Sequence, residues 1–182
     1  ALIFVYSAAH AVQTHWTFFS VGKFNWTETL VGSSLGVSGF MAALVQGYLI
    51  RFIQPKLGNE KSIFYGLSLY AIGMILFAFA SESWMMFAFL VPYGLGGIAG
   101  PALQSVISSQ VPKNEQGELQ GALASLVSLT AIIGPPLMTN IFYYFTHDSA
   151  PFIFPGAPFF LGFLLMAISA VIVYFVFRKK QI

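Results

Sequence analysis

The chain has 182 residues, of which 57% are hydrophobic and only 8% are charged, and its mean hydropathy is +0.78. A soluble domain has about 25% charged residues, so this composition excludes a water-soluble protein and indicates one embedded in a membrane. The formal net charge of +2 does not suggest nucleic-acid binding, and the absence of cysteine excludes disulfides and thiolate chemistry.

Six apolar segments are each long enough to cross a bilayer as a helix, which takes about 20 residues. They predict an all-α, multi-pass membrane fold. The predicted spans are residues 1–21, 28–52, 62–80, 84–108, 119–145 and 157–177. The chain begins at Ala1 within an apolar run, so we expect the sequence to be part of a longer protein.

Basic residues are distributed unevenly between the predicted links, and Lys and Arg favour the cytoplasmic side of a membrane. The links after the first, third and fifth spans contain only Lys23. The other links and the C-terminal tail contain Arg51, Lys56, Lys61, Lys113, Arg178, Lys179 and Lys180. We therefore expect these seven residues, and both ends of the chain, on the cytoplasmic side.

Four of the six spans have small and polar residues at helical spacing along one face, whereas residues 62–80 and 157–177 are almost purely apolar. The order is inner, inner, outer, inner, inner, outer, which is typical of two inverted three-helix repeats in secondary transporters. We expect the polar faces to surround a substrate cavity. Its candidate residues are His10, Gln13, Thr14, Trp16, Thr17, Gln46, Tyr93, Gln104, Ser125 and Ser128.

Glycine and proline occur within the fourth and fifth spans. Proline removes a helical hydrogen bond and clashes with the preceding turn, which predicts loosened backbone near Gly97, Ala131 and Ile132. Such breaks persist in hydrocarbon only where protein or a wet cavity satisfies the freed groups, although a harmless kink is the alternative. The candidate hinge residues here are Gly97, Gly100, Pro101, Gly134 and Pro135. The pairs Gly32/Gly36 and Gly96/Gly100 predict close helix packing.

No acidic or basic residue lies at mid-depth in any predicted span, where only His10 and His15 titrate near neutral pH. Five residues separate them by about 140° around a helix, so we expect no metal site and no cofactor. His10 is a candidate for contacting substrate or relaying a proton, and a hydrogen bond within the bundle is the alternative.

One motif suggests an enzyme: Gly36-Val37-Ser38-Gly39 has the Gly-x-Ser-Gly form found in rhomboid intramembrane proteases. A nucleophilic serine needs a base within reach. The one histidine after Ser38 is His147, in a predicted outer link. We therefore expect no catalytic residue and no enzyme activity.

An ordered series of short motifs resembles the C-terminal half of a major facilitator superfamily exporter, and is most similar to the tetracycline/proton antiporter group. The motifs are Lys23-Phe24-Asn25-Trp26, Gln46-Gly47, residues 96–104 (GGIAGPALQ) and residues 132–137 (IIGPPL). The resemblance implies the seventh to twelfth helices of a twelve-helix transporter, with the seventh, eighth, tenth and eleventh lining a central cavity. It also implies that Pro55–Lys61, which includes Gly58 and follows Arg51, is a cytoplasmic gating link.

The expected function is half of a proton-coupled secondary transporter that exports small amphipathic organic compounds by alternating access. The expected location is a bacterial inner membrane. The expected partners are the small-molecule substrate, protons, the lipid bilayer, and a missing N-terminal six-helix half or a second copy of the chain. The alternative is a non-transporting membrane module that binds a ligand or partner protein through its polar face.

Overall fold

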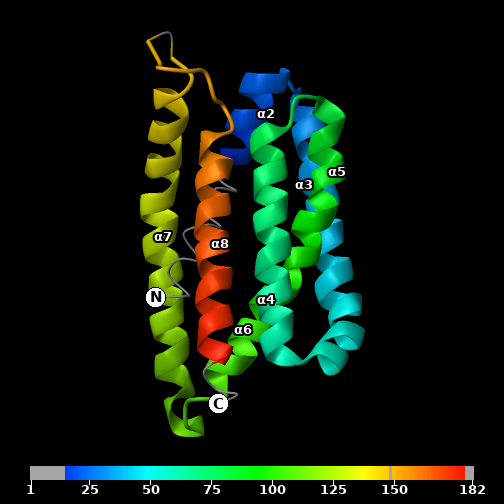
Figure 1. Cartoon of the computed structure of the whole chain (residues 1–182), viewed down its shortest axis with the longest axis vertical. Coiled ribbons are helices and arrows are strands. Elements are labelled where there is room, and N and C mark those ends of the chain that lie inside the picture. The colour runs from blue at the N-terminus through cyan, green and yellow to red at the C-terminus, as the bar shows by residue number, and fades with distance from the viewer. Residues whose placement is uncertain (1–14, 148, 179–182) are drawn as a thin grey trace.

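The computed structural model describes residues 15–147 and 149–178, and these residues contain helices and no strands (Figure 1). A π-helical turn, Val45–Leu49, joins α3 (Glu28–Leu44) to α4 (Ile50–Phe79). A 3₁₀ turn, Gly96–Ile98, joins α5 (Ser83–Leu95) to α6 (Ala99–Ser108). A further 3₁₀ turn, Lys113–Glu115, precedes α7. The α-helices are α2 (Trp16–Phe24), α3 (Glu28–Leu44), α4 (Ile50–Phe79), α5 (Ser83–Leu95), α6 (Ala99–Ser108), α7 (Gln116–Tyr144) and α8 (Ala157–Arg178).

Four helical stretches in the described chain are long and apolar enough to cross a membrane: Glu28–Phe79, Ser83–Ser108, Lys113–Tyr144 and Ala157–Arg178. The first has 52 residues. At 1.5 Å per residue it would extend about 78 Å if straight, against a hydrocarbon core of about 30 Å. It folds back on itself instead, so that its two parts lie in opposite directions (Figure 1).

The reversal within α4 occurs at Gly58, whose φ of 75° and ψ of 167° are not helical. Glycine adopts a positive φ without the steric cost that a Cβ would add. Asn59 holds the restarted helix in place, because its side-chain amide donates to Ser105 Oγ of α6 at 3.1 Å. Gln54 in turn donates to the Asn59 side-chain oxygen. This reversal lies in the link predicted between residues 52 and 62.

The two predicted proline breaks have different outcomes. The backbone of the fourth predicted span tightens into a 3₁₀ turn at Gly96–Ile98, and this turn contains Gly97, whose carbonyl Pro101 leaves without a helical donor. By contrast, α7 continues without interruption through Pro135 and Pro136, so the prediction of a broken helix there is wrong. Pro135 and Pro136 remove the helical donors of the Ala131 and Ile132 carbonyls. Both residues are exposed in this chain, so the freed carbonyls do not require a break in the helix.

The centre of the bundle is α4, which packs against α8, α5 and α6. Glycines allow the closest approaches. A Cβ built on Gly66 would lie 2.7 Å from Ala99 N, one on Gly73 would lie 2.7 Å from Tyr93 Cβ, and one on Gly96 would lie 2.6 Å from Tyr70 Cγ. Within this chain the predicted close packing is present at Gly96, whereas Cβ atoms built on Gly32 and Gly36 meet nothing within 4 Å.

The two helices predicted to face lipid, α4 and α8, each combine a buried face with an exposed apolar stripe. The stripe on α4 consists of Tyr65, Ile72 and Phe79, seven residues apart. The stripe on α8 consists of Leu164, Ile168, Val171 and Phe175. These two sets are called the lipid-facing stripes below. The sequence pattern correctly suggested their apolar exterior, but not that α4 is also the most heavily packed helix.

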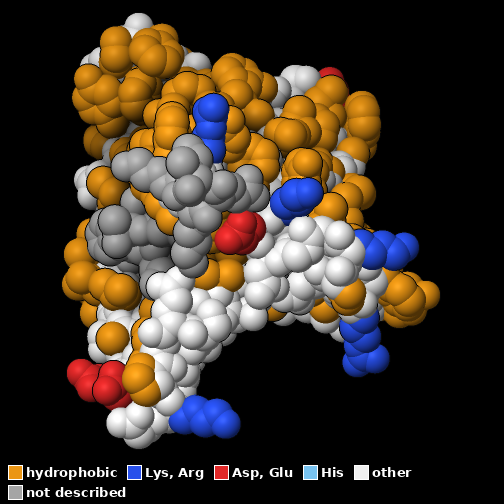
Figure 2. All heavy atoms as spheres, turned by 60° about the horizontal axis from the view of Figure 1, so that its bottom comes forward, with side chains coloured by type: hydrophobic (Ala, Val, Ile, Leu, Met, Phe, Trp, Pro, Cys, Tyr) orange, Lys and Arg blue, Asp and Glu red, His pale blue; other side chains and the backbone are white. Residues whose placement is uncertain are grey.

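The links that contain most of the basic residues lie at one end of the bundle. The reversal within α4, the α6–α7 link and the end of α8 are at the bottom of Figure 1, whereas α2 and the α7–α8 link are at the top. Seen from below, Lys and Arg side chains are spread around the bottom end (Figure 2). Among the described residues, Lys23 thus lies at one end of the bundle and the other basic residues lie at the opposite end, as the sequence predicted.

Candidate functional site

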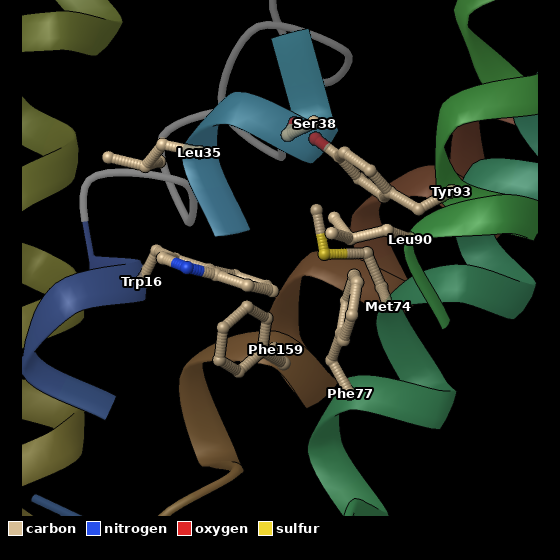
Figure 3. Close-up of a pocket in the computed structure, with 8 residues that line it drawn as sticks. All are labelled: Trp16, Leu35, Ser38, Met74, Phe77, Leu90, Tyr93 and Phe159. Atoms are coloured by element: carbon tan, nitrogen blue, oxygen red, sulfur yellow. The ribbon is translucent and has the colours of Figure 1, made fainter. Parts of the chain in front are cut away.

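A small pocket lies inside the bundle, where α2, α3, α4, α5 and α8 converge (Figure 3). Its volume is about 50 Å³. A water molecule occupies about 30 Å³ of liquid and drug-sized ligands need about 300–1,000 Å³, so a drug-sized compound would fit only if the walls moved apart. The lining residues are Trp16, Leu35, Ser38, Met74, Phe77, Leu90, Tyr93 and Phe159.

Trp16 is fixed in the pocket wall by one hydrogen bond between helices. Its indole N–H donates to Ser34 Oγ at 2.9 Å, and both residues are buried. The Ser34 hydroxyl donates in turn to the Val31 carbonyl at 2.7 Å. A buried indole needs an acceptor, because an unsatisfied donor costs free energy in an apolar environment. This bond therefore sets the position of the Trp16 ring and ties α2 to α3.

Aromatic rings form most of the remaining wall. Phe77 is the hub: its ring centroid is 5.1 Å from that of Trp16, 5.6 Å from that of Tyr93 and 5.6 Å from that of Phe159. The contacts of Phe77 with Trp16 and Tyr93 are edge-to-face, a favoured arrangement for aromatic pairs. Such a wall suits apolar or aromatic groups, and the Ser38 and Tyr93 hydroxyls add polar character.

Replacing Ser34 with alanine is expected to destabilise the α2–α3 contact by about 1–3 kcal/mol, because the Trp16 N–H would remain buried without an acceptor. Ser33→Ala is the matched control, since the Ser33 hydroxyl is exposed and donates only within its own helix, to the Thr29 carbonyl. Thermal unfolding of the purified variants measures the difference. Equal midpoints for the two variants would contradict this role of the bond.

The structure brings only two of the predicted cavity residues, Trp16 and Tyr93, into this pocket. Thr17 is exposed and lies along a shallow groove with Val21 and Trp26. His10, Gln13 and Thr14 lie outside the described residues. The other four predicted cavity residues are exposed and do not line this pocket: Gln46, Gln104, Ser125 and Ser128.

The candidate hinge residues are spread over three regions. Arg51 and Gly58 are exposed near the reversal of α4. Gly97 is buried in the 3₁₀ turn, and Gly100 and Pro101 begin α6 immediately after it. Gly134 is buried within the continuous α7, beside the half-buried Pro135.

Sequence reasoning missed most of the pocket wall. Phe77 and Phe159 belong to the two spans predicted to face lipid, and a search for polar stripes does not select apolar residues such as Leu35, Met74 and Leu90. Ser38, the serine of the Gly-x-Ser-Gly motif, lines the pocket, and the pocket lining contains no histidine. His147 is instead bonded to the Tyr143 carbonyl, at 3.0 Å, at the end of α7.

Two further titratable groups lie near α2. His15 is 2% exposed, its ring centroid is 4.6 Å from that of Phe142, and its Nε2 has no hydrogen-bond partner. Lys23 Nζ lies 5.3 Å from the Phe19 ring centroid, and partial burial lowers the pKa of Lys23. Among the described residues, no group of three His, Cys, Asp or Glu side chains could hold a metal ion.

The helices, their apolar stripes and the polar side chains on other faces define a multi-pass α-helical membrane protein. Residues 2–181 match the sequence model of the Major Facilitator Superfamily, and the chain belongs to this family. The family consists of transporters rather than enzymes, in agreement with the expectation of no enzyme activity.

The sequence is similar to several tetracycline resistance proteins. It is 40% identical to the class C protein of Escherichia coli over 127 residues, which are 70% of this chain and 32% of that protein. It is 43% identical to the class E protein of Escherichia coli over 122 residues, 67% of this chain and 30% of the relative. It is 33% identical to the class H protein of Pasteurella multocida over 166 residues, 91% of this chain and 40% of the relative. The chain thus spans between about a third and two fifths of these relatives.

Proposed function

We propose that this chain is one half of a proton-coupled secondary transporter that exports small amphipathic organic compounds across a bacterial inner membrane. Family membership and the similarity to tetracycline resistance proteins support a drug-efflux role. The structural observation that carries the proposal is that Gln46, Gln104, Ser125 and Ser128 are exposed on membrane-length helices. Polar side chains are costly in hydrocarbon, so these faces need water or another protein surface.

A second six-helix bundle is the proposed source of that surface. The relatives are longer than the matched region, which supports an N-terminal half, and a second copy of this chain is the other arrangement that would supply one. In the proposed architecture the chain has six spans in two inverted three-helix repeats, corresponding to helices 7–12. The reversal at Gly58 supports counting residues 28–79 as two of these spans.

Both termini are proposed to lie on the cytoplasmic side. The clustering of basic links at one end of the bundle supports this orientation (Figure 2). Alternating access would come from rocking of this bundle against its companion around a site near the midplane. The described helices have no carboxylate at mid-depth, so we propose that the main proton-carrying acid belongs to the companion half.

The internal aromatic pocket is the proposed contact for the apolar part of the substrate. Trp16 and Tyr93, which the sequence selected, lie in its wall beside the Phe77 hub. Since the volume is about 50 Å³, only a ring or side group of a substrate could enter without movement of the walls. Opening of the pocket during the transport cycle would admit a larger part of the substrate.

Single cysteines test the proposed wet interface, because the chain has no cysteine of its own. In the intact protein, freed of other cysteines, Gln46→Cys, Gln104→Cys and Ser128→Cys are expected to react with a membrane-impermeant maleimide. The rates are expected to change when substrate is added or the pH is shifted. Ile72→Cys and Ile168→Cys are matched controls, since these residues are 47% and 49% exposed but lie on the lipid-facing stripes.

The controls are expected to react at least about tenfold more slowly, because hydrocarbon excludes both water and the reagent. Equal reaction of both sets would contradict a wet interface opposite a lipid face. If the cysteines at the polar positions react at rates that do not change with substrate or pH, the alternative is favoured. That alternative is a membrane module that binds a ligand or partner without transporting it.

A further inference from the structure

A second groove opens on the outside of the bundle, at the end where the basic residues cluster. It lies between the part of α4 that follows Gly58 and the end of α8, and its volume is about 460 Å³. This groove is separate from the aromatic pocket and shares no residue with it. Its lining residues are Glu60, Lys61, Phe64, Tyr65, Val173, Tyr174, Phe177 and Arg178.

The two cations of the groove, Lys61 and Arg178, form no ion pair within the described part of the chain. Within that part, no carboxylate oxygen lies within 4.0 Å of either side chain. The Arg178 guanidinium carbon lies 6.0 Å from the centroid of the Tyr174 ring, and the Tyr174 ring is 6.0 Å from that of Phe64. Aromatic side chains thus position one cation at the rim while leaving its charge available to an external anion.

The groove joins directly onto the lipid-facing stripes. Tyr65 belongs both to the groove and to the stripe on α4, and Tyr174 lies beside Phe175 of the stripe on α8. From Lys61 to Phe79 the helix rises about 27 Å, close to the thickness of one hydrocarbon core of about 30 Å. A bilayer placed on this stripe would put the charged groove at the level of the headgroups of one leaflet and the stripe beside it at the level of the acyl chains.

We propose that this groove is a binding site for an anionic phospholipid. The phosphate of the lipid lies between Lys61 and Arg178, and the acyl chains follow Phe64, Tyr65 and the exposed stripe into the bilayer. Basic pockets between membrane helices at the cytoplasmic surface have the chemistry to hold acidic headgroups, and a cation near the surface attracts them by about 1 kcal/mol. The arrangement joins charge at one end of the site to apolar surface at the other, as a phospholipid requires.

Glu60 affects which phospholipid headgroup, anionic or zwitterionic, the groove prefers. With one acid and two bases the groove has a formal charge of +1, which favours an anionic headgroup over a zwitterionic one. A zwitterionic headgroup would place its ammonium on Glu60, whereas an anionic one gains nothing from this carboxylate and is repelled by it. Lys179 and Lys180, which follow Arg178 in the sequence, lie outside the described residues.

Native mass spectrometry of the intact protein tests the site, with phosphatidylglycerol, phosphatidylethanolamine and phosphatidylcholine added in turn to delipidated samples. Phosphatidylglycerol is expected to bind most tightly. Lys61→Gln and Arg178→Gln are each expected to weaken its binding about fivefold, and the double variant about 30-fold, since each cation near the surface contributes about 1 kcal/mol. Lys113→Gln is the matched control, because Lys113 lies at the same end of the bundle but outside the groove.

Glu60→Gln is expected to leave phosphatidylglycerol binding unchanged or to strengthen it. The assignment is overturned if Lys113→Gln weakens binding as much as the groove variants, which would show a diffuse charge effect. It is equally overturned if phosphatidylethanolamine binds more tightly than phosphatidylglycerol and Glu60→Gln abolishes that preference, or if inorganic phosphate displaces the lipid at millimolar concentration. Because these substitutions are at exposed or rim positions, unchanged thermal midpoints confirm that each variant is folded.

Discussion

Gly73→Ala is expected to lower the stability of the bundle by about 1–3 kcal/mol, the usual cost of adding atoms to a fully packed contact. The new Cβ would lie 2.7 Å from Tyr93 Cβ and 2.8 Å from Tyr93 Cα. Neither atom belongs to the flexible end of a side chain, so α4 and α5 would have to separate. Tyr93 lines the aromatic pocket, and its displacement would also change the pocket wall. Thermal unfolding in detergent measures the loss.

Gly39→Ala is the matched control for this substitution. Gly39 also lies in a membrane-length helix, but a Cβ built there meets nothing within 4 Å. Alanine is favoured over glycine within a helix by about 0.5–1 kcal/mol, so this variant is expected to be at least as stable as the parent. If Gly39→Ala proved the more damaging of the two in the intact protein, the companion bundle would have to pack on this face of α3.

Phe77→Ala is expected to be the most destabilising of the substitutions considered, at about 3–5 kcal/mol, because it removes a buried aromatic side chain and leaves a cavity. Phe77 is 1% exposed and contacts Trp16, Tyr93 and Phe159 at the centre of the pocket wall. The variant would also enlarge the pocket. Transport assays at a temperature where the variant stays folded are therefore expected to show a shift in preference toward bulkier substrates.

Phe79→Ala is the comparison that isolates burial, since Phe79 lies two residues away on α4 but is 63% exposed on the lipid-facing stripe. Its truncation is expected to cost less than about 1 kcal/mol, as is usual for surface positions. Comparable losses in the two variants, or an unchanged substrate preference in Phe77→Ala, would show that the Phe77 hub does not organise the pocket.

Hydropathy predicted the helices well because a membrane span leaves a long, continuous signal. The ends of α5–α6, α7 and α8 lie close to the predicted boundaries, and the reversal at Gly58 lies in a predicted link. The interruption predicted at Pro135 and Pro136 was wrong, because two missing donors on an exposed helix do not force the backbone out of its helical conformation.

The candidate site was harder to predict than the fold. Polar periodicity selected Trp16 and Tyr93, but it also selected Gln46 and Gln104, which are exposed and do not line the aromatic pocket. Apolar residues such as Phe77 carry no sequence signal that separates a pocket wall from a lipid contact. That distinction depends on which helices pack together, and only the three-dimensional arrangement provides it.

The attachment of α7 has a consequence for motion. Its buried residues, Thr130, Gly134 and Met138, recur every fourth position and so form a single line, and α7 packs mainly against α8. Among the described residues, a shift of α7 relative to α8 would therefore disturb little of the packing of α4 with α5 and α6.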